Sequence, residues 1–167
     1  MAVTHFSSKN KKIKIILIGK NIVTASYDKT SRLWDVASGK QLHVFEGHTD
    51  LVWSAGFSPD GKKIVTASWD KTIRIWDTFT GNLLVNLEGH TDIVTSAIFS
   101  SNGESVLSIS GDNTARLWEA SSGRPIHTLE GHTDIVTSAV FSPDGKKIIT
   151  ASKDKSIRLW DTFSGKI

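Results

Sequence analysis

GHTDLVWSAGFSPDGKKIVTASWDKTIRIWDTFTGN, residues 47–82, decides the fold, because residues 131–166 repeat it with 27 of 36 positions identical. The markers of the repeat recur at a constant spacing of 42 residues. Gly-His pairs stand at Gly47-His48, Gly89-His90 and Gly131-His132. A tryptophan followed by an acidic residue stands at Trp34-Asp35, Trp76-Asp77, Trp118-Glu119 and Trp160-Asp161. A period of this length indicates an array of similar structural units.

Each unit contains short strand signals separated by turns. In the second unit, residues 51–57 alternate apolar and small side chains, residues 64–68 are β-branched and small, and residues 72–76 alternate again. A fourth apolar segment covers residues 83–87. Ser58-Pro59-Asp60-Gly61 has Pro and Gly where a turn needs a fixed and a positive φ. No helical period is long enough to make a helix, so one unit is predicted to be a four-stranded antiparallel meander.

A meander of about forty residues buries little surface alone and needs neighbours on both faces. The Gly-His and Trp-Asp markers at this period resemble the WD-repeat family, and the resemblance covers nearly the whole chain. It implies an all-β fold, a β-propeller built of four-stranded antiparallel blades. Two departures are Glu119 in place of Asp and an irregular first repeat.

The expected layout is one domain, residues 1–167, with about four blades. Blade one covers 1–46 with an insertion near 9–19, blade two 47–88, blade three 89–130, and blade four 131–167 without its outer strand. Such a ring is not closed by this chain alone. Three arrangements would resolve this: a piece of a longer protein, two chains joined as half-propellers in a homodimer that completes a ring, or four blades closed on themselves.

Each unit also carries a His, a Ser and an Asp at fixed offsets, which are the components of a hydrolase charge system. The sequence has no strained G-x-S-x-G elbow and no obvious oxyanion hole. The set also recurs in step with a Trp, as framework residues do. We therefore expect no enzyme activity and no catalytic residue.

The family resemblance implies instead a buried Asp–His–Ser–Trp tetrad in each blade. A Ser hydroxyl can accept the indole N–H, and His can join Ser to Asp. The expected tetrads are Asp70, His48, Ser68 and Trp76; Asp112, His90, Ser110 and Trp118; and Asp154, His132, Ser152 and Trp160. Blade one keeps an incomplete set, Ser26, Asp28 and Trp34. A periodic arginine, two residues before each Trp, is assigned to packing and charge pairing.

Positions that break the repeat are candidates for function. Trp53 corresponds to Thr95 and Thr137, whereas Trp69 corresponds to Tyr27, Gly111 and Lys153. The resemblance places these positions on the top face of the propeller, where exposed aromatic rings are typical of interface hot spots. The candidate partner-binding residues are Trp53, Trp69, Tyr27, Thr95, Thr137 and Lys153. The plainer alternative is that Trp53 and Trp69 pack on each other.

Composition limits the remaining classes. The chain has no Cys, a net charge of +3 and no apolar run that could cross a bilayer. We expect that the chain binds no cofactor and no metal and does not contact a membrane. We do not expect nucleic acid as a partner, and we expect a cytoplasmic location. The predicted function is a protein–protein interaction scaffold that binds a protein or peptide. The alternative is a regulatory or sensor module of a larger multidomain protein whose effector lies outside this chain.

Overall fold

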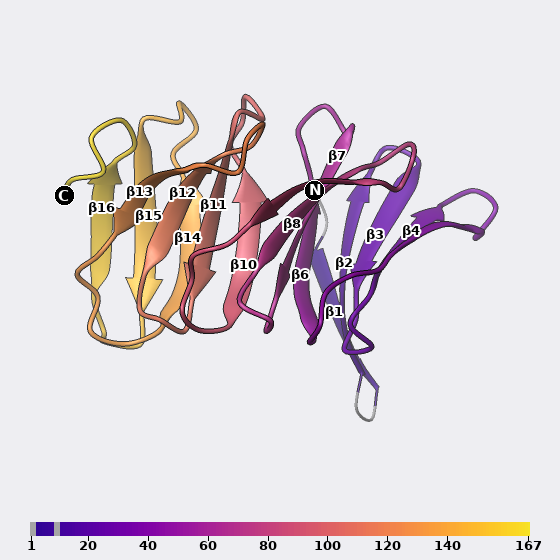
Figure 1. Cartoon of the computed structure of the whole chain (residues 1–167), viewed down its shortest axis with the longest axis horizontal. Helices are drawn as coiled ribbons and strands as arrows, with labels where there is room; N and C mark the ends of the chain where they lie inside the picture. The colour runs from indigo at the N-terminus through magenta and orange to yellow at the C-terminus, as the bar shows by residue number, and fades with distance from the viewer. Residues whose placement is uncertain (1–2, 9–10) are drawn as a thin grey trace.

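The computed structural model describes residues 3–8 and 11–167, and this part of the chain is all-β. Its strands form four antiparallel sheets that lie face to face in a row, from blade one at the right of Figure 1 to blade four at the left. The row is open at both ends, so the four blades do not close a ring. The predicted all-β propeller segment is confirmed.

The sheets have five, four, four and three strands. Within each sheet, every strand is hydrogen-bonded to the strands next to it in the sequence. Blade one contains β1 (Val3–Ser8), β2 (Lys11–Ile18), β3 (Asn21–Ala25), β4 (Ser31–Asp35) and β5 (Gln41–Phe45). Blade two contains β6 (Val52–Phe57), β7 (Lys63–Ser68), β8 (Ile73–Asp77) and β9 (Leu83–Leu87). Blade three contains β10 (Val94–Phe99), β11 (Ser105–Ser110), β12 (Ala115–Glu119) and β13 (Pro125–Leu129). Blade four contains β14 (Val136–Phe141), β15 (Lys147–Ser152) and β16 (Ile157–Asp161).

The first blade has five strands, one more than the meander expected for each unit. Residues 11–18, expected to belong to an insertion, form β2, which pairs with β3 in the register Ile16↔Val23. The residues expected to open the blade form β1, an additional strand on the other edge of β2. Gly19, with φ of +56°, makes the tight β2–β3 turn that allows this pairing. Residues 9–10 lie outside the described residues.

The core lies between the blades rather than inside any one of them. Ile64 and Trp76 of blade two pack with Phe45 of blade one in one buried cluster. The same positions of blades three and four pack against blades two and three. Because each inner sheet is covered on both faces, side chains on both sides of its strands are buried.

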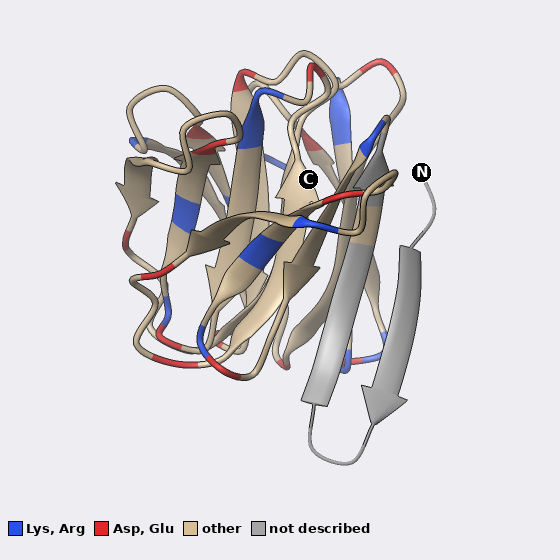
Figure 2. Cartoon of the chain, turned by 90° about the vertical axis from the view of Figure 1, so that its right-hand side faces the viewer, with Lys and Arg blue, Asp and Glu red and all other residues tan. Residues whose placement is uncertain are grey.

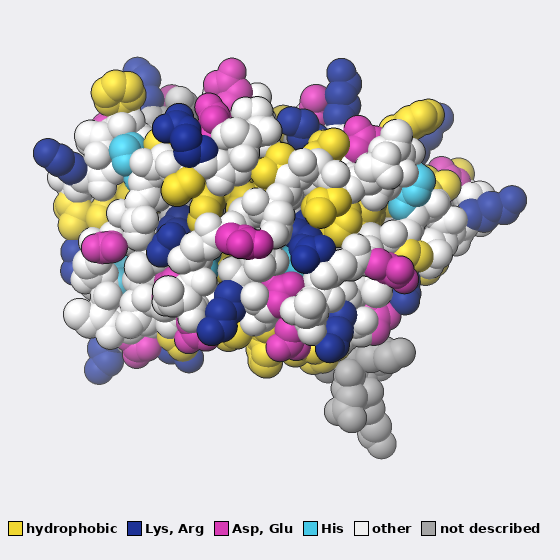
Figure 3. All heavy atoms as spheres, in the orientation of Figure 1, with side chains coloured by type: hydrophobic (Ala, Val, Ile, Leu, Met, Phe, Trp, Pro, Cys, Tyr) yellow, Lys and Arg dark blue, Asp and Glu magenta, His cyan; other side chains and the backbone are white. Residues whose placement is uncertain are grey.

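Blade four has one uncovered face. Ile157 and Leu159 of β16 are 75% and 50% exposed, whereas the equivalent Ile73 and Ile75 of blade two are fully buried. Val140 and Ile149 are exposed on the same blade. Apolar side chains reach the surface over β15 and β16 at the left of Figure 3.

Candidate functional site

A buried chain of hydrogen bonds crosses blade two from Trp76 to Asp70. The Trp76 indole donates to Thr66 Oγ1 over 2.9 Å. His48 Nε2 lies 2.8 Å from the same oxygen, and His48 Nδ1 lies 2.7 Å from Asp70 Oδ2. The His48 side chain is 0% exposed and that of Asp70 is 4% exposed. The network of hydrogen bonds therefore joins β7, β8, the β7–β8 turn and the loop before β6 in the interior of the blade.

The same network recurs in the next two blades. In blade three, Trp118 donates to Ser108 Oγ over 2.8 Å, and His90 joins Ser108 to Asp112 over 2.8 Å at each ring nitrogen. In blade four the members are Trp160, Thr150, His132 and Asp154, at 2.8–2.9 Å. The indole edge of each Trp also meets the imidazole in a T-shaped contact, with centroids 6.0–6.5 Å apart.

The predicted hydroxyl member was wrong in every blade. Ser68 does not contact His48; its Oγ donates to the Asp50 carbonyl over 3.0 Å and accepts from the Asp70 N–H over 3.1 Å. Ser110 Oγ likewise donates to the Asp92 carbonyl and accepts from the Asp112 N–H. Ser152 Oγ donates to the Asp134 carbonyl and accepts from the Asp154 N–H. The reason is register: Trp76 pairs with Ile64, so its indole reaches Thr66, two residues before Ser68 on the same face of β7.

The chemistry of the end groups fixes the hydrogen-bond direction at both ends of the network. The indole can only donate, so it occupies a lone pair of Thr66 Oγ1. His48 Nδ1 donates to the Asp70 carboxylate, and the Thr66 hydroxyl has both His48 Nε2 at 2.8 Å and the Arg74 carbonyl at 3.4 Å within hydrogen-bonding distance. Every polar atom in the relay then has a partner, which such a buried group requires.

The acidic member is held as a carboxylate. Burial alone would raise the pKa of Asp70, but hydrogen bonds from His48 and Thr72 hold this pKa well below its usual range. The pKa of Asp112 is lowered in the same way by His90 and Thr114 against the same burial. For Asp154 the hydrogen bond from the Ser156 hydroxyl is the largest cause of a lowered pKa.

Blade one carries only part of the network. Trp34 donates to Thr24 Oγ1 over 3.0 Å, so Thr24 replaces the predicted Ser26. Ser26 accepts the Asp28 N–H over 3.3 Å. Asp28 forms an ion pair with Arg32 over 2.8 Å and lies at a half-exposed turn. Burial would raise the pKa of Asp28, but hydrogen bonds from Thr30 lower it.

An arginine side chain packs against the glycine of each Gly-His pair and leaves no room for a Cβ there. Gly89 has φ of +150°, and a Cβ there would lie 2.7 Å from an Arg116 Nη and 3.2 Å from the Trp118 ring. The Arg116 guanidinium lies 5.9 Å from the Trp118 centroid. Gly47 and Gly131 lie against Arg74 and Arg158 in the same manner. The periodic arginines are thus packed between glycine and tryptophan.

The residues that break the repeat form one aromatic stack. Trp53 stacks on Trp69 with centroids 5.3 Å apart and a 20° interplanar angle, and Tyr27 stacks on Trp53 at 5.8 Å and 19°. All three rings are half-buried. Tyr27 lies in the β3–β4 turn, Trp53 near the start of β6 and Trp69 in the β7–β8 turn, so the stack crosses from blade one to blade two. The Trp69 Nε1 is buried and has no hydrogen-bond partner among the described residues.

The other three candidate positions continue along the same end without aromatic rings. Thr95 is half-buried, and Thr137 and Lys153 are exposed. Thr137 Oγ1 donates to the Ala151 carbonyl over 3.2 Å. The structure therefore brings together Tyr27, Trp53 and Trp69 and leaves the other three outside the stack.

The match to known sequences follows the blade pattern. The family model described as "WD domain, G-beta repeat" matches residues 39–77, 81–119 and 123–161, which is more than half of the chain. The chain belongs to the WD-repeat family. Each matched segment begins at the turn before an outer strand and ends at the acidic residue after the Trp.

Similar WD-repeat proteins match over a single repeat. "Dynein assembly factor with WD repeat domains 1" of Xenopus laevis is 45% identical over 40 residues, which is 24% of this chain and 10% of that protein. "F-box-like/WD repeat-containing protein TBL1X" of Mus musculus is 48% identical over 40 residues, 24% of this chain and 8% of that protein. "WD40 repeat-containing protein HOS15" of Arabidopsis thaliana is 48% identical over 40 residues, 24% of this chain and 6% of that protein. The chain thus covers about a tenth or less of these relatives.

The described surface of the WD repeats mixes both signs of charge. In Figure 2, Lys and Arg lie interspersed with Asp and Glu over the strands and turns. Among residues 3–8 and 11–167, no three His, Asp or Glu side chains cluster closely enough to hold a metal ion. The same residues include no helix with the length and hydrophobicity to span a membrane.

Proposed function

We propose that this chain is a non-catalytic protein-binding module, and that it docks a protein or peptide on the Tyr27–Trp53–Trp69 stack. The observation that carries this proposal is the continuous stack of three half-buried rings at positions where the other blades have small or polar residues. Large rigid aromatic side chains supply contact area with little loss of conformational entropy, which is why they dominate interface energetics.

The buried networks support the non-catalytic part of the proposal. The His48, His90 and His132 side chains are at most 1% exposed, so a substrate would have no access to them. Their hydrogen-bonding capacity is used within the blade. A cytoplasmic location and the lack of a cofactor stay predictions.

The proposal is tested with residues that the chain itself uses elsewhere. Trp53→Thr with Trp69→Gly copies Thr95 and Gly111 of blade three, so the blade is expected to stay folded. Quantitative pull-downs are compared between the wild type and this double variant, with Thr95→Ala as a control at the same end of the next blade. We expect partners of the wild type to be lost with the double variant and kept with Thr95→Ala. An unchanged set of partners on a folded double variant contradicts the proposal.

A second candidate function is a regulatory or sensor module within a larger protein. The relative whose name joins "F-box-like" to "WD repeat-containing" carries its repeats beside another kind of element. A coding sequence that continues into a kinase or nucleotide-binding signature would favour this function over a plain scaffold. One that adds only WD repeats would favour the scaffold.

We also propose that a second copy of this chain covers the open face of blade four. At each internal junction, the face that carries Ile73 and Ile75, or their equivalents, is covered by a Trp-bearing face of the next blade. Blade one offers such a face with Ile22 and Trp34, which are half-buried. Two chains joined head to tail would bury both faces and form an eight-bladed ring.

A further inference from the structure

The sequence has one Asn-Gly pair, Asn102-Gly103, and it lies in the turn between β10 and β11. An asparagine followed by glycine loses its side-chain ammonia readily, because a glycine has no Cβ to keep its backbone nitrogen away from the side-chain carbonyl carbon. The same turn carries Asp60-Gly61 in blade two and Asp144-Gly145 in blade four. Among these three blades, only blade three therefore pairs a side-chain amide with a following glycine.

The β10–β11 turn is open to water and touches the neighbouring blade. Asn102 and Glu104 are exposed, and Gly103 is half-buried. A Cβ at Gly103 would lie 3.6 Å from Pro59 Cδ, so this turn packs against the β6–β7 turn of blade two. Asn102 and Gly103 also line a polar pocket together with residues of that turn. A chemical change at Asn102 therefore occurs at the junction of two blades.

Hydrogen bonds hold every group that a reaction between Asn102 and Gly103 has to move. Asn102 Oδ1 accepts from Ser100 Oγ over 2.6 Å and from the Glu104 N–H over 3.1 Å. Asn102 Nδ2 donates to Glu104 Oε2 over 2.8 Å. The Gly103 N–H donates to the Ser100 carbonyl over 2.9 Å. The closed turn therefore restrains the reaction, and the rate depends on how often the turn opens.

We propose that Asn102 is a site of spontaneous deamidation, and that the hydrogen bonds of the closed turn, including the one to Glu104, restrain it. In the opened turn, the Gly103 nitrogen attacks Asn102 Cγ and forms a new C–N bond. The bond from Cγ to Nδ2 breaks, and Nδ2 leaves as ammonia with the proton that the Gly103 nitrogen gives up. Water then adds to either carbonyl carbon of the five-membered succinimide ring and opens it. One opening gives aspartate, and the other gives isoaspartate.

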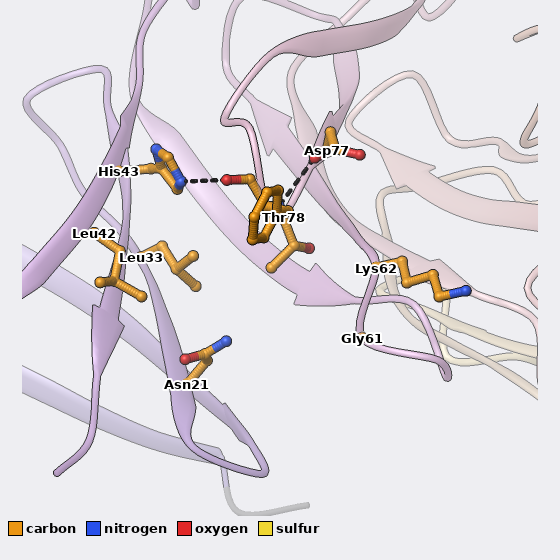
Figure 4. Close-up of a pocket in the computed structure, with 9 residues that line it drawn as sticks. Asn21, Leu33, Leu42, His43, Gly61, Lys62, Asp77 and Thr78 are labelled. Carbon is orange, nitrogen blue, oxygen red and sulfur yellow. Dashed lines mark hydrogen bonds between the residues drawn. The ribbon is translucent and has the colours of Figure 1, made fainter.

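Blade two shows that this turn accepts a carboxylate when a lysine follows. The pKa of Asp60 is lowered, chiefly by the hydrogen bond from the Ser58 hydroxyl, and the charge of Lys62 lowers it further. The Lys62 side chain points away from the blade-one residues that Figure 4 draws. Blade three has Glu104 at the position of Lys62. A carboxylate formed at position 102 therefore faces a second negative charge instead of a positive one.

Both products weaken the turn, for different reasons. The aspartate loses the hydrogen bond from Nδ2 to Glu104 and repels the Glu104 carboxylate. In the isoaspartate, the main chain runs through the former side-chain carbons, so the spacing between Ser100 and the Gly103 N–H changes as well. The site lies at the opposite end of the blades from the aromatic stack, and the reaction does not depend on partner binding there.

The site is tested by peptide mass spectrometry of the full chain during incubation at mildly alkaline pH. In guanidinium chloride, which opens every turn, we expect Asn102 to gain one mass unit and to give both aspartate and isoaspartate. Asn113, which is followed by Thr114, is the internal control and should keep its amide over the same period. In the folded chain, the rate at Asn102 should be at least tenfold lower. Gly103→Ala should slow the reaction in guanidinium chloride, because its Cβ shields the attacking nitrogen.

The restraint and the charge are tested with residues that the other blades use. Glu104→Lys copies Lys62 and removes the acceptor of the Asn102 amide. It should raise the rate at Asn102 at least twofold in the folded chain and leave the rate in guanidinium chloride unchanged. Asn102→Asp represents the aspartate product and should lower the urea midpoint at low salt. Adding Glu104→Lys to Asn102→Asp copies blade two and should restore the midpoint.

Several outcomes overturn the proposal. Equal rates at Asn102 in the folded and unfolded chain exclude the restraint, and equal ammonia loss at Asn113 excludes a dedicated site. An unchanged rate in a folded Glu104→Lys chain removes the role of Glu104, and Glu104→Ala serves if the lysine variant does not fold. A urea midpoint that Asn102→Asp leaves unchanged contradicts the repulsion between the two carboxylates.

Discussion

At the residue scale, the hydroxyl of Thr66 receives the indole proton of Trp76 and approaches His48 Nε2 at the same time. Thr66→Val keeps the shape but leaves two buried polar atoms without partners. We expect a loss of about 2 kcal/mol of unfolding free energy. Each buried polar atom without a partner costs about 1–3 kcal/mol, and local relaxation recovers part of that cost. Urea unfolding at neutral pH measures it. Ser68→Ala is the control and should cost less, since Ser68 contacts only backbone groups; the opposite order contradicts the assignment.

The imidazole of blade three offers a second test. His90→Ala removes the only link between Ser108 Oγ and Asp112 Oδ2 seen among the described residues, and leaves both buried. We expect a loss of about 1–3 kcal/mol in unfolding free energy. Thr91→Ala is the matched control, because Thr91 is exposed and reaches Asp112 only through its backbone N–H. A His90→Ala chain that unfolds with the wild type in urea would show that the network contributes nothing.

Acid should weaken the fold through the buried carboxylates. The pKa of Asp112 is lowered in the folded state by His90 and Thr114, whereas the unfolded value is about 3.9. A lowered pKa means that the contribution is fully present above about pH 5 and is lost as pH falls toward the folded pKa. Asp112→Asn should therefore flatten the fall in unfolding free energy between pH 5 and pH 2, measured by urea titrations. An identical slope in variant and wild type would exclude this carboxylate as a cause.

The Asp, His and Trp partners could be predicted at this scale, but the hydroxyl could not. Ser68 and Thr66 lie on the same face of β7, and both recur with the repeat, so periodicity alone does not separate them. Only the pairing of Trp76 with Ile64 decides between them. A register argument from the Trp, made before choosing the serine, would have found Thr66.

At the scale of one element, the turn before each inner strand depends on glycine. Gly89→Ala forces a side chain into φ of +150° and places its Cβ 2.7 Å from an Arg116 Nη. We expect a loss of about 1–3 kcal/mol for the backbone alone, and more from the contact. Thermal and urea unfolding measure it against Gly39→Ala, which also has a positive φ, +66°, but whose Cβ meets nothing within 4 Å, so the difference between the two variants reports mainly the contact with Arg116. Adding Arg116→Ala to Gly89→Ala should recover the steric part; no recovery would assign the whole cost to the backbone.

Elements were predicted best where repeat and turn chemistry agree. The strands of blades two to four follow the alternation and the Pro-Asp-Gly or Asn-Gly turns. Blade one was predicted less closely, because its repeat markers before Asn21 are missing and no copy fixed the register of residues 11–18. The composition of residues 11–18 predicts a strand. Whether that strand pairs with β3 depends on the tertiary context, here the free edge of β3, which the sequence of residues 11–18 does not specify.

At the scale of the whole molecule, self-association follows from the two open faces. A chain with Ile157 75% and Leu159 50% exposed presents an apolar sheet face that the internal junctions bury completely. Light scattering should give twice the 18.3 kDa chain mass for the wild type. Ile157→Lys with Leu159→Lys should give a monomer, whereas Leu84→Lys, at an outer edge position 47% exposed, should not. A monodisperse wild-type monomer contradicts the proposed ring.

The geometry of the pair can be separated from its existence by mixing variants. In a head-to-tail ring each junction joins blade four of one chain to blade one of the other. A chain with Ile157→Lys and Leu159→Lys keeps an intact blade-one face, and a chain with Ile22→Lys and Trp34→Lys keeps an intact blade-four face. Mixed, the two should form a heterodimer through one intact junction, although each alone is monomeric. A dimer that joined two blade-four faces would lose its interface with the first variant, and adding the second chain would not restore it.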